Sequence, residues 1–507
     1  MTNASSEAAE SSARVLELDS RLNHAPSRRL VEAAFAEDLA AQAGLASALD
    51  WVDIAHTLTL AREGMTPAAP ARELLAALRQ LEATSECPPW RAEDGDLYTN
   101  REAWLVERTP AAGWLGMARA RREALTTAFH MTVREKIIVL ALELIEAAKI
   151  FVAHAKTHRF TIMSDYTYLQ AAQPTTFGHY LLGFVSPMLR DLDRLDGLYA
   201  RFNLSPAGIG SSNGSLTFQN RAELARRLGF AAPVAHARDA MWQSDLAIEA
   251  LSNAVTCVVS TDRLAEDLMV FTTGEFGTVR LSDCHSRASK IMPNKRNPFA
   301  LAYVRGAANR LIGLQAAMAA AARTPSGQMD NRMQAYEAVP QALGMAARVV
   351  GLMGEVVAEL SVDRSRAVSG LKDREVCAAD LAERLTVAIG IDYRAAHRSV
   401  GRMMRQLADR GRSLGDVSAD EVAASVDRPD AVAEIAGVLA LALDLDACVS
   451  ARGDVGGCAA EEVLRLANSH AEWMAATKSI WCDRQIGLRR AKNQLDAEVS
   501  GFLREVS

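Results

Sequence analysis

Aromatic residues are scarce in this chain of 507 residues, at 6% of the total, and strand-like patterns are weak. No run of alternating β-branched residues is present, and no Asn-Gly pair joins two apolar arms as a hairpin turn would. Alanine and leucine dominate instead, and this balance favours helices over strands. The sequence therefore predicts an all-α fold.

Long apolar runs and paired cysteines are also missing. No stretch of about 18 uncharged apolar residues occurs, so we expect no membrane-spanning helix and no membrane partner. A net charge of −6 gives no sign of a nucleic-acid partner. The seven cysteines are odd in number and none has CxxC spacing, which predicts reduced thiols, a cytoplasmic protein and no metal site.

Proline-free windows are where long helices can run, because proline interrupts a helix interior. Three such windows stand out: 111–173, 234–292 and 341–428. Residues 342–360 in the third window are almost entirely apolar, and such a helix needs burial on nearly every side. A central helix bundle, extended by partner subunits, would supply that burial.

Composition and these windows suggest four parts along the chain. The first is rich in Ser, Ala and Glu and is predicted to be a disordered tail. The parts are the tail at 1–26, a helical N-terminal domain at 27–112, a central long-helix bundle at 113–370 and a helical C-terminal domain at 371–507. A Gly-rich break at 207–215 is predicted to be a loop.

The stretch 281–298, LSDCHSRASKIMPNKRNP, concentrates cations and amides around two prolines. A loop of this composition is what an anionic substrate needs. Composition alone leaves open a solvated basic surface loop.

The order of residues in this stretch carries more information than its composition. Residues 288–298, ASKIMPNKRNP, resemble the signature of the aspartase/fumarase superfamily, whose Met-Pro-x-Lys-x-Asn-Pro half is intact here. Further blocks resemble argininosuccinate lyase in the same order, at 53–58, 166–178, 217–230, 263–277 and 378–401. The resemblance covers roughly residues 29–460. It implies an aspartase/fumarase-type fold and a homotetramer in which each active site draws on three subunits, with no metal, nucleotide or organic cofactor.

The resemblance also implies a reaction and its main groups. A proton is removed from the carbon beside the C–N bond of an N-substituted succinate, and the amine leaves as fumarate forms. Ser289 is the base by resemblance, and Lys295 and Asn297 stabilise the extra negative charge on the carboxylate. A serine can act so only where its oxyanion is stabilised. The roles of Lys290 and His285 in this loop are left open.

A second segment should hold the other end of the succinyl group. Thr167, Gln170 and Gln173 are neutral donors able to grip a carboxylate, and they match the argininosuccinate lyase pattern. Tyr168 stands where that family has a histidine linked to proton transfer. A phenol can donate a proton but differs from an imidazole, and a packing aromatic stays an open alternative.

Three arginines complete the set of candidate substrate-binding residues. Arg121 keeps the place of a substrate-side arginine in the family, and Arg122 replaces an asparagine there. Arg221 falls where the family has another substrate-side arginine. A bidentate grip on a carboxylate is a natural use of arginine, and a surface or interface ion pair is the alternative for each.

The resemblance breaks at residues 331–340, NRMQAYEAVP, where argininosuccinate lyases recognise the arginine part of the substrate. Two polar family residues have become Ala335 and Ala338, and Tyr336 has appeared. Unpaired guanidinium donors would cost about 1–3 kcal/mol each. We therefore expect a carbon–nitrogen lyase acting on an N-substituted aspartate other than argininosuccinate, with Tyr336 on the amine side.

Other interpretations stay open. The first is argininosuccinate lyase itself, giving arginine and fumarate. The second is a catalytically inactive structural relative, against which the retained Ser289, Lys295 and Asn297 argue. The third is a helical scaffold protein, which would not explain the ordered blocks.

Overall fold

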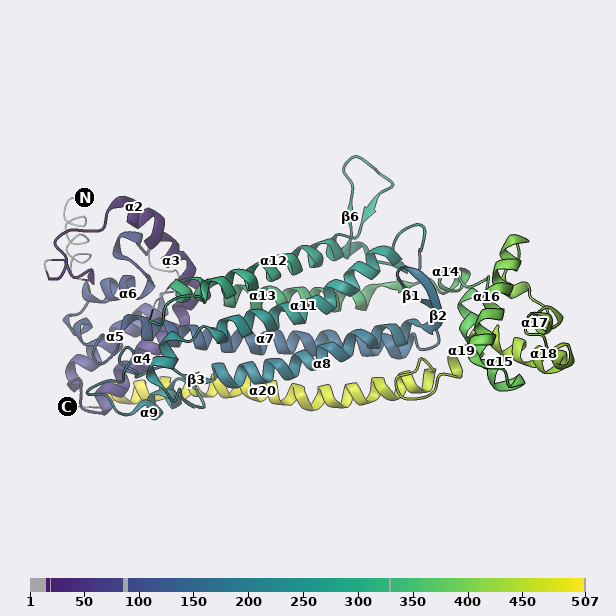
Figure 1. Cartoon of the computed structure of the whole chain (residues 1–507). Coiled ribbons are helices and arrows are strands. Elements are labelled where there is room, and N and C mark those ends of the chain that lie inside the picture. Colours follow the sequence, from purple (N-terminus) through teal and green to yellow (C-terminus); the bar gives the residue numbers. More distant parts are fainter. Residues whose placement is uncertain (1–14, 19, 85–89, 328–329, 506–507) are drawn as a thin grey trace.

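A computed structural model of the chain describes residues 15–18, 20–84, 90–327 and 330–505, and no side chains at 330–332. Most of the predicted tail at 1–26 lies outside the described residues. The chain forms an elongated molecule with a long helix bundle between two groups of shorter helices (Figure 1). The predicted domain boundaries remain a prediction.

The N-terminal group of helices lies at the end of the bundle where α7 begins (Figure 1). Its core is built by α4 and α5, whose buried leucines belong to the main apolar cluster of the chain. The elements are α2 (Arg28–Leu30), η1 (Val31–Phe35), α3 (Ala36–Gln42), η2 (Ala43–Leu45), α4 (Ala46–Arg62), α5 (Ala68–Ala83), η3 (Ala92–Asp94), α6 (Leu97–Val106) and η4 (Pro110–Trp114).

Within the described residues, the bundle is built from the long helices α7 (Arg121–Thr157), α8 (Phe177–Phe202), α11 (Asp245–Phe271), α12 (Phe299–Ala321), α13 (Asp330–Glu359) and α20 (Ala460–Arg504). The first two predicted windows contain α7 and α11, and the apolar run at 342–360 ends α13. Proline did not interrupt every helix, however, because Pro187 lies inside α8 and Pro340 inside α13.

Helix α13 is long and apolar enough to cross a membrane by length and composition, over Met333–Glu359. In the structure, 61% of its apolar window is buried within the protein. Its neighbours are α7, α11 and α12, so the helix is a core element of the bundle. The apolar composition of residues 342–360 predicted that this helix would be buried among others.

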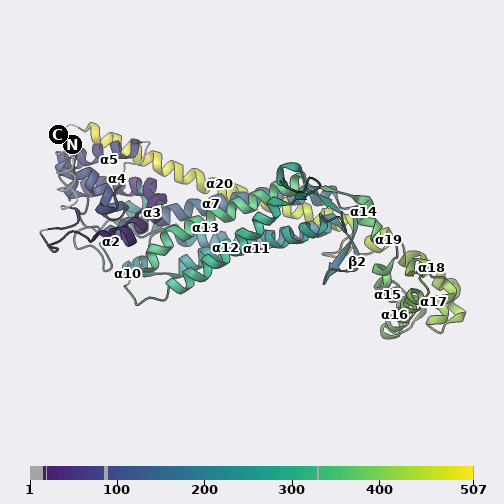
Figure 2. The same ribbon diagram turned by 90° about the horizontal axis from the view of Figure 1, so that it is seen from above.

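Helix α20 has 45 residues and runs back along the whole bundle to the N-terminal group (Figures 1 and 2). Trp481, Leu495 and Phe502 of this helix are buried in the main apolar cluster. The sequence assigned these residues to a C-terminal domain, and it gave no signal for their return to the bundle.

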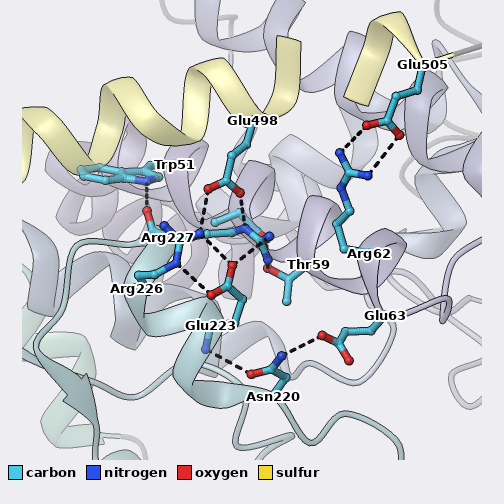
Figure 3. A network of polar contacts seen from close by, with 11 residues as sticks. Trp51, Thr59, Arg62, Glu63, Asn220, Glu223, Arg226, Arg227, Glu498 and Glu505 are labelled. Carbon is cyan, nitrogen blue, oxygen red and sulfur yellow. Dashed lines mark hydrogen bonds and ion pairs between the residues drawn. The ribbon is translucent and has the colours of Figure 1, made fainter. Parts of the chain in front are cut away.

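Polar contacts fasten the last turns of α20 to α4 and to the short helix α9 (Arg221–Arg227), as Figure 3 shows. The carboxylate of Glu498 accepts hydrogen bonds from Arg226 and Arg227, each at 2.7 Å. The indole of Trp51 on α4 donates to the carbonyl of Arg227 at 3.0 Å. These contacts fix α9, whose first residue is the candidate Arg221.

The C-terminal group has an apolar core of its own, which includes Leu381, Leu385, Val422 and Ile435. It lies at the other end of the bundle from the N-terminal group (Figure 1). The elements between α13 and α20 are α14 (Arg364–Ser369), which packs against β1, and then η6 (Glu375–Cys377), α15 (Ala378–Ile389), α16 (Tyr393–Asp409), η7 (Leu414–Asp416), α17 (Ala419–Ser425), η8 (Pro429–Ala431), α18 (Val432–Ala442) and α19 (Leu445–Ser450).

Strands are few and short in the described part of the chain, and they occur as two-stranded pairs. Antiparallel pairs are formed by β1 (Ile162–Thr167) with β2 (Gln170–Thr176), β5 (Val279–Arg280) with β8 (Ser361–Val362), and β6 (Arg287–Ala288) with β7 (Arg296–Asn297). A parallel pair joins β3 (Leu204–Ser205) to β4 (Ala232–Pro233), and α10 (Ala237–Trp242) follows it. The β1–β2 hairpin forms without an Asn-Gly pair at its turn.

Candidate active site

Residues 287–297, which hold most of the signature, form a hairpin that projects from the bundle in the connection from α11 to α12 (Figure 1). Strands β6 and β7 pair Ala288 with Arg296 at its base. The backbone N–H of Ser289 donates to the carbonyl of Lys295 at 3.2 Å, and that of Lys295 donates to Met292 at 3.0 Å. The turn that carries Ser289 and Lys295 is therefore closed by its own backbone.

The hydroxyl of Ser289 sits where backbone donors surround it. Its oxygen accepts hydrogen bonds from the N–H groups of Ile291 at 3.3 Å and Met292 at 3.0 Å. Such donors favour an oxyanion over a neutral hydroxyl, because they bind the negative form more strongly. Lys290 and Lys295 of the same turn are exposed. The turn thus offers the Ser289 oxygen two backbone donors and carries two exposed cations.

The end of the hairpin is held by Asn297 and Arg296. The amide of Asn297 donates to the carbonyl of Arg287 at 3.1 Å. Arg296 forms an ion pair with Asp283 at 2.7 Å and donates to the carbonyl of Leu281. Arg296 thus ties the hairpin to the segment before it.

The second candidate segment is the hairpin of β1 and β2. Thr167 pairs with Gln170 across a two-residue turn made by Tyr168 and Leu169. Both turn residues are left-handed, with φ of 55° and 58°, where hairpins usually place Asn-Gly. This backbone is strained for two residues with bulky side chains. The Tyr168 side chain is 99% exposed, and Thr167, Gln170 and Gln173 are exposed as well.

The base of this hairpin is firmly packed. The ring of Tyr166 contacts those of Phe271 and Phe276, with centroids 5.9 and 5.7 Å apart. Thr175 bonds to the Nδ1 atom of His179 at 3.1 Å. The β1–β2 hairpin therefore has a packed base, and Thr167, Tyr168 and Gln170 at its tip are exposed.

The candidate arginines lie at the opposite end of the bundle. The Nε atom of Arg121 is 3.3 Å from Asp96, and a guanidinium nitrogen of Arg122 is 3.8 Å from Asp38. Arg221 donates to two backbone carbonyls, at 3.1 Å to Ala207 and at 3.3 Å to Ser205. Burial lowers the pKa of Arg221.

Beside these arginines is a buried charged cluster that the sequence did not predict. Asp53 is fully buried and forms ion pairs with Arg119 at 2.9 Å and with Arg101 at 2.8 Å. The Nε and one terminal nitrogen of Arg119 are buried without a hydrogen-bond partner among the described residues. An arginine with unused donors can receive a further anion.

Glu123, one turn into α7, belongs to the same cluster. Its Oε1 atom accepts a hydrogen bond from the backbone N–H of Gly208 at 2.6 Å. Burial raises the pKa of this carboxyl to about 7. Gly208 has a φ of 81°, and a Cβ there would lie 2.7 Å from the ring of Phe218, so the contact depends on glycine. The predicted loop at 207–215 gave no hint of this partner.

Tyr336 lies inside the bundle in this chain. Its side chain is buried, its hydroxyl is 2.9 Å from that of Thr126, and its ring contacts Phe129. Ala335 and Ala338 beside it are buried as well. The structure therefore brings Tyr336 together with core residues, at the same end of the bundle as Arg121.

The candidate residues lie in separate segments of one chain, and the arginine group is far from the Thr167 hairpin. Helix α7 starts at Arg121 and ends at Thr157, just before the β1–β2 hairpin (Figure 1). Its 37 residues span roughly 55 Å at the usual rise of an α-helix. The Arg121 group and the Thr167 group therefore cannot share one site within a single chain.

Known proteins resemble this chain over most of its length. A family model described as "Lyase" matches residues 66–313, and one described as "Argininosuccinate lyase C-terminal" matches residues 375–450. The chain is 32% identical to the argininosuccinate lyase of Methanoculleus marisnigri over 467 residues, covering 89% of this chain and 92% of that protein. It is 31% identical to that of Symbiobacterium thermophilum over 418 residues, covering 81% and 89%.

Solved structures resemble the fold. A variant of EDDS lyase with bound fumarate superposes with a TM-score of 0.84 at 22% identity, covering 95% of this chain and 97% of that one. A fumarate lyase from Mesorhizobium sp. BNC1 gives 0.70 at 19% identity, covering 87% and 97%. The prediction of an all-α fold of aspartase/fumarase type is confirmed.

Proposed function

Because this chain belongs to the argininosuccinate lyase branch of the aspartase/fumarase superfamily and is a carbon–nitrogen lyase, we propose that it releases an amine other than arginine from an N-substituted aspartate, leaving fumarate. The cytoplasmic location predicted from the cysteines stays a prediction.

The observation that carries this proposal is the loss of polar side chains from the segment that matches the arginine-recognising segment of argininosuccinate lyases. Ala335 and Ala338 replace polar family residues, and both are buried in the bundle. Tyr336 between them is buried too, with its hydroxyl bonded to Thr126. The two alanine side chains offer a guanidinium group no acceptor, and each donor left unpaired would cost about 1–3 kcal/mol. A smaller or less polar amine avoids that cost.

The succinyl half of the reaction falls to the Ser289 hairpin. The oxygen of Ser289 takes a proton from the carbon adjacent to the C–N carbon, and the electron pair moves onto the neighbouring carboxylate. Lys295 and Asn297 stabilise the doubly charged carboxylate that results. The electron pair then forms the double bond of fumarate as the C–N bond breaks. The two N–H groups that donate to Ser289 support its role as the base.

The leaving nitrogen needs a proton, and Tyr168 is our candidate donor. Its phenol is 99% exposed at the tip of a strained turn in the single chain. Backbone strain costs free energy in an isolated chain and is typical of residues at active sites. The exposed side chain is free to complete a site on another subunit. Thr167, Gln170 and Gln173 on the same hairpin would bind the second carboxylate.

A homotetramer brings these groups together in the proposal. Three chains contribute to each site: one provides the Arg121, Arg122 and Arg221 group, one the Thr167 hairpin and one the Ser289 hairpin. The length of α7, about 55 Å, supports placing the arginine group and the Thr167 hairpin of one site on different chains, because no rearrangement short of unfolding would join the two ends within one chain.

Fumarate absorbance in the ultraviolet tests the proposal. The purified protein is incubated with argininosuccinate and, in the reverse direction, with fumarate and a panel of amines, with Ser289→Ala as the inactive control. We expect turnover with at least one other amine and little with argininosuccinate. Turnover of argininosuccinate above that of every other pair would refute the altered amine and favour argininosuccinate lyase. No reaction in either direction would refute catalysis.

A further inference from the structure

Three metal-binding side chains meet at the base of the Ser289 hairpin. The Sγ atom of Cys284, the Nδ1 atom of His285 and the Oε2 atom of Glu359 all lie within 4.8 Å of one another. The thiol is 3.5 Å from the imidazole and 2.8 Å from the carboxylate, and the imidazole is 3.9 Å from the carboxylate. The elimination described above uses none of these groups.

The backbone holds the two halves of this cluster in place. Cys284 and His285 belong to the turn η5 (Asp283–His285), and Glu359 is the last residue of α13. Strands β5 and β8 pair immediately beside them, so both segments are fixed before any ligand arrives. The side chain of His285 is only 6% exposed, whereas Cys284 and Glu359 are open to solvent. The cluster is therefore held by buried His285 on one side and is open to solvent at Cys284 and Glu359.

The ligand types and spacings suit a metal ion. Thiolate, imidazole and carboxylate together are the usual set for zinc and its neighbours in the first transition row. Around a tetrahedral zinc ion, bonds of about 2.0–2.3 Å place ligand atoms roughly 3.5 Å from one another. The sulfur–imidazole distance of 3.5 Å matches that value, the sulfur–carboxylate distance of 2.8 Å is shorter and the imidazole–carboxylate distance of 3.9 Å is longer. Small side-chain rotations would bring all three to the required spacing.

We propose that Cys284, His285 and Glu359 bind a divalent transition metal ion of the zinc type. The fourth position is open to water or to the hydroxyl of Ser282, which lies 3.2 Å from the thiol. The proposal stands apart from the elimination reaction and from the choice of amine.

The binding step balances without a further reactant. In the free protein the Cys284 thiol donates a hydrogen bond to the carboxylate of Glu359 and keeps its proton. When the ion binds, the sulfur–metal bond forms, the S–H bond breaks, and the proton leaves to solvent. A thiolate beside a carboxylate would be unfavourable on its own, and the positive ion removes that repulsion.

Such an ion would act on the hairpin that carries Ser289. Asp283, next to Cys284, pairs with Arg296 in that hairpin at 2.7 Å. A bound ion would therefore fix both the turn η5 and, through Asp283, the base of the hairpin. The sequence predicted no metal site because no two cysteines have CxxC spacing and Glu359 is 75 residues from Cys284.

Cobalt binding to the full-length, chelator-treated protein tests the proposal. We expect one Co²⁺ per chain, a thiolate-to-cobalt charge-transfer band in the near ultraviolet, and loss of the band when Zn²⁺ displaces cobalt. Cys284→Ser should abolish the band, and Glu359→Gln should weaken binding at least about tenfold. Cys482→Ser, which changes a partly exposed cysteine on α20, should change neither.

Two outcomes would overturn the site. One is the absence of a charge-transfer band at millimolar cobalt with folding intact by circular dichroism. The other is a band that persists in Cys284→Ser, because another cysteine would then supply the sulfur. Since the readout is optical, both outcomes are separate from any failure of the lyase assay.

Discussion

The hydroxyl oxygens of Thr126 and Tyr336 lie 2.9 Å apart inside the bundle, and both side chains are buried. Tyr336→Phe should therefore lower the free energy of unfolding by about 1 kcal/mol, because a buried hydroxyl loses its partner. We expect the KM to stay unchanged. Thermal denaturation and steady-state kinetics check this, and an increased KM with unchanged stability would instead support contact with the amine.

Glu123 should make stability depend on pH. Burial raises the pKa of its carboxyl from 4.5 to about 7 in the folded chain. The folded state therefore holds the proton more tightly, so this contribution to stability is complete below pH 4.5 and is lost as the pH rises to about 7. The loss amounts to about 3 kcal/mol at most.

Glu123→Gln removes this titration while keeping an oxygen for the N–H of Gly208. The variant should match the wild type in acid and exceed its stability near neutral pH. Denaturant unfolding of both proteins across this range measures the difference, and parallel curves would contradict the assignment.

Ser289→Ala should lower kcat by about 100- to 10,000-fold, the usual contribution of a positioned base. The matched control is Ser286→Ala in the same loop. The Ser286 hydroxyl donates to the carbonyl of Ser282 at 3.0 Å, and we give it no part in the reaction. Similar losses in the two variants would point to loop folding in place of proton transfer.

Subunit mixing tests the shared sites. Ser289→Ala and Tyr168→Phe should each be nearly inactive alone. When the two are unfolded together in equal amounts and reassembled, about a quarter of the sites in a randomly mixed tetramer receive both wild-type residues from different chains. Activity should recover to that level. Mixtures as inactive as the single variants would mean that both residues act from one chain.

The contacts at the end of α20 should contribute to stability unequally. Glu498 bonds to Arg227, which is only 8% exposed, so Glu498→Gln should destabilise the protein by about 1 kcal/mol. Glu505 pairs with Arg62 where both side chains are more than 40% exposed, and Glu505→Gln should have almost no effect. Equal changes in melting temperature would contradict this ranking.

Much of the bundle was predictable from local pattern. Helices α7 and α11 fill proline-free windows, and the apolar run in α13 is buried as its composition required. The proline rule failed at Pro187 and Pro340, because packing over a long helix outweighs one lost hydrogen bond. The aspartase/fumarase type of fold came from ordered blocks of residues, which periodicity alone does not supply.

The candidate site was predictable only where its residues are close in sequence. The turn from Ser289 to Asn297 was identified by residue order. The left-handed turn at Tyr168 has none of the usual turn residues, so no local signal predicted it. The bond between Glu123 and Gly208 joins residues 85 positions apart, and only the folded chain brings them together.

Helix α20 follows the C-terminal group in sequence but packs in the bundle. The chain leaves the bundle after α13, builds the separate apolar core of α15 to α18, and re-enters the bundle as α20. The C-terminal group is therefore a long insertion that is joined to the bundle by two chain connections. The family model described as "Argininosuccinate lyase C-terminal" matches residues 375–450 within it. Evolution can therefore lengthen, tilt or exchange this appendage while leaving the bundle intact. Helix α20, by contrast, supplies Trp481, Leu495 and Phe502 to the main apolar cluster, so a change in this helix would reach the core of the bundle.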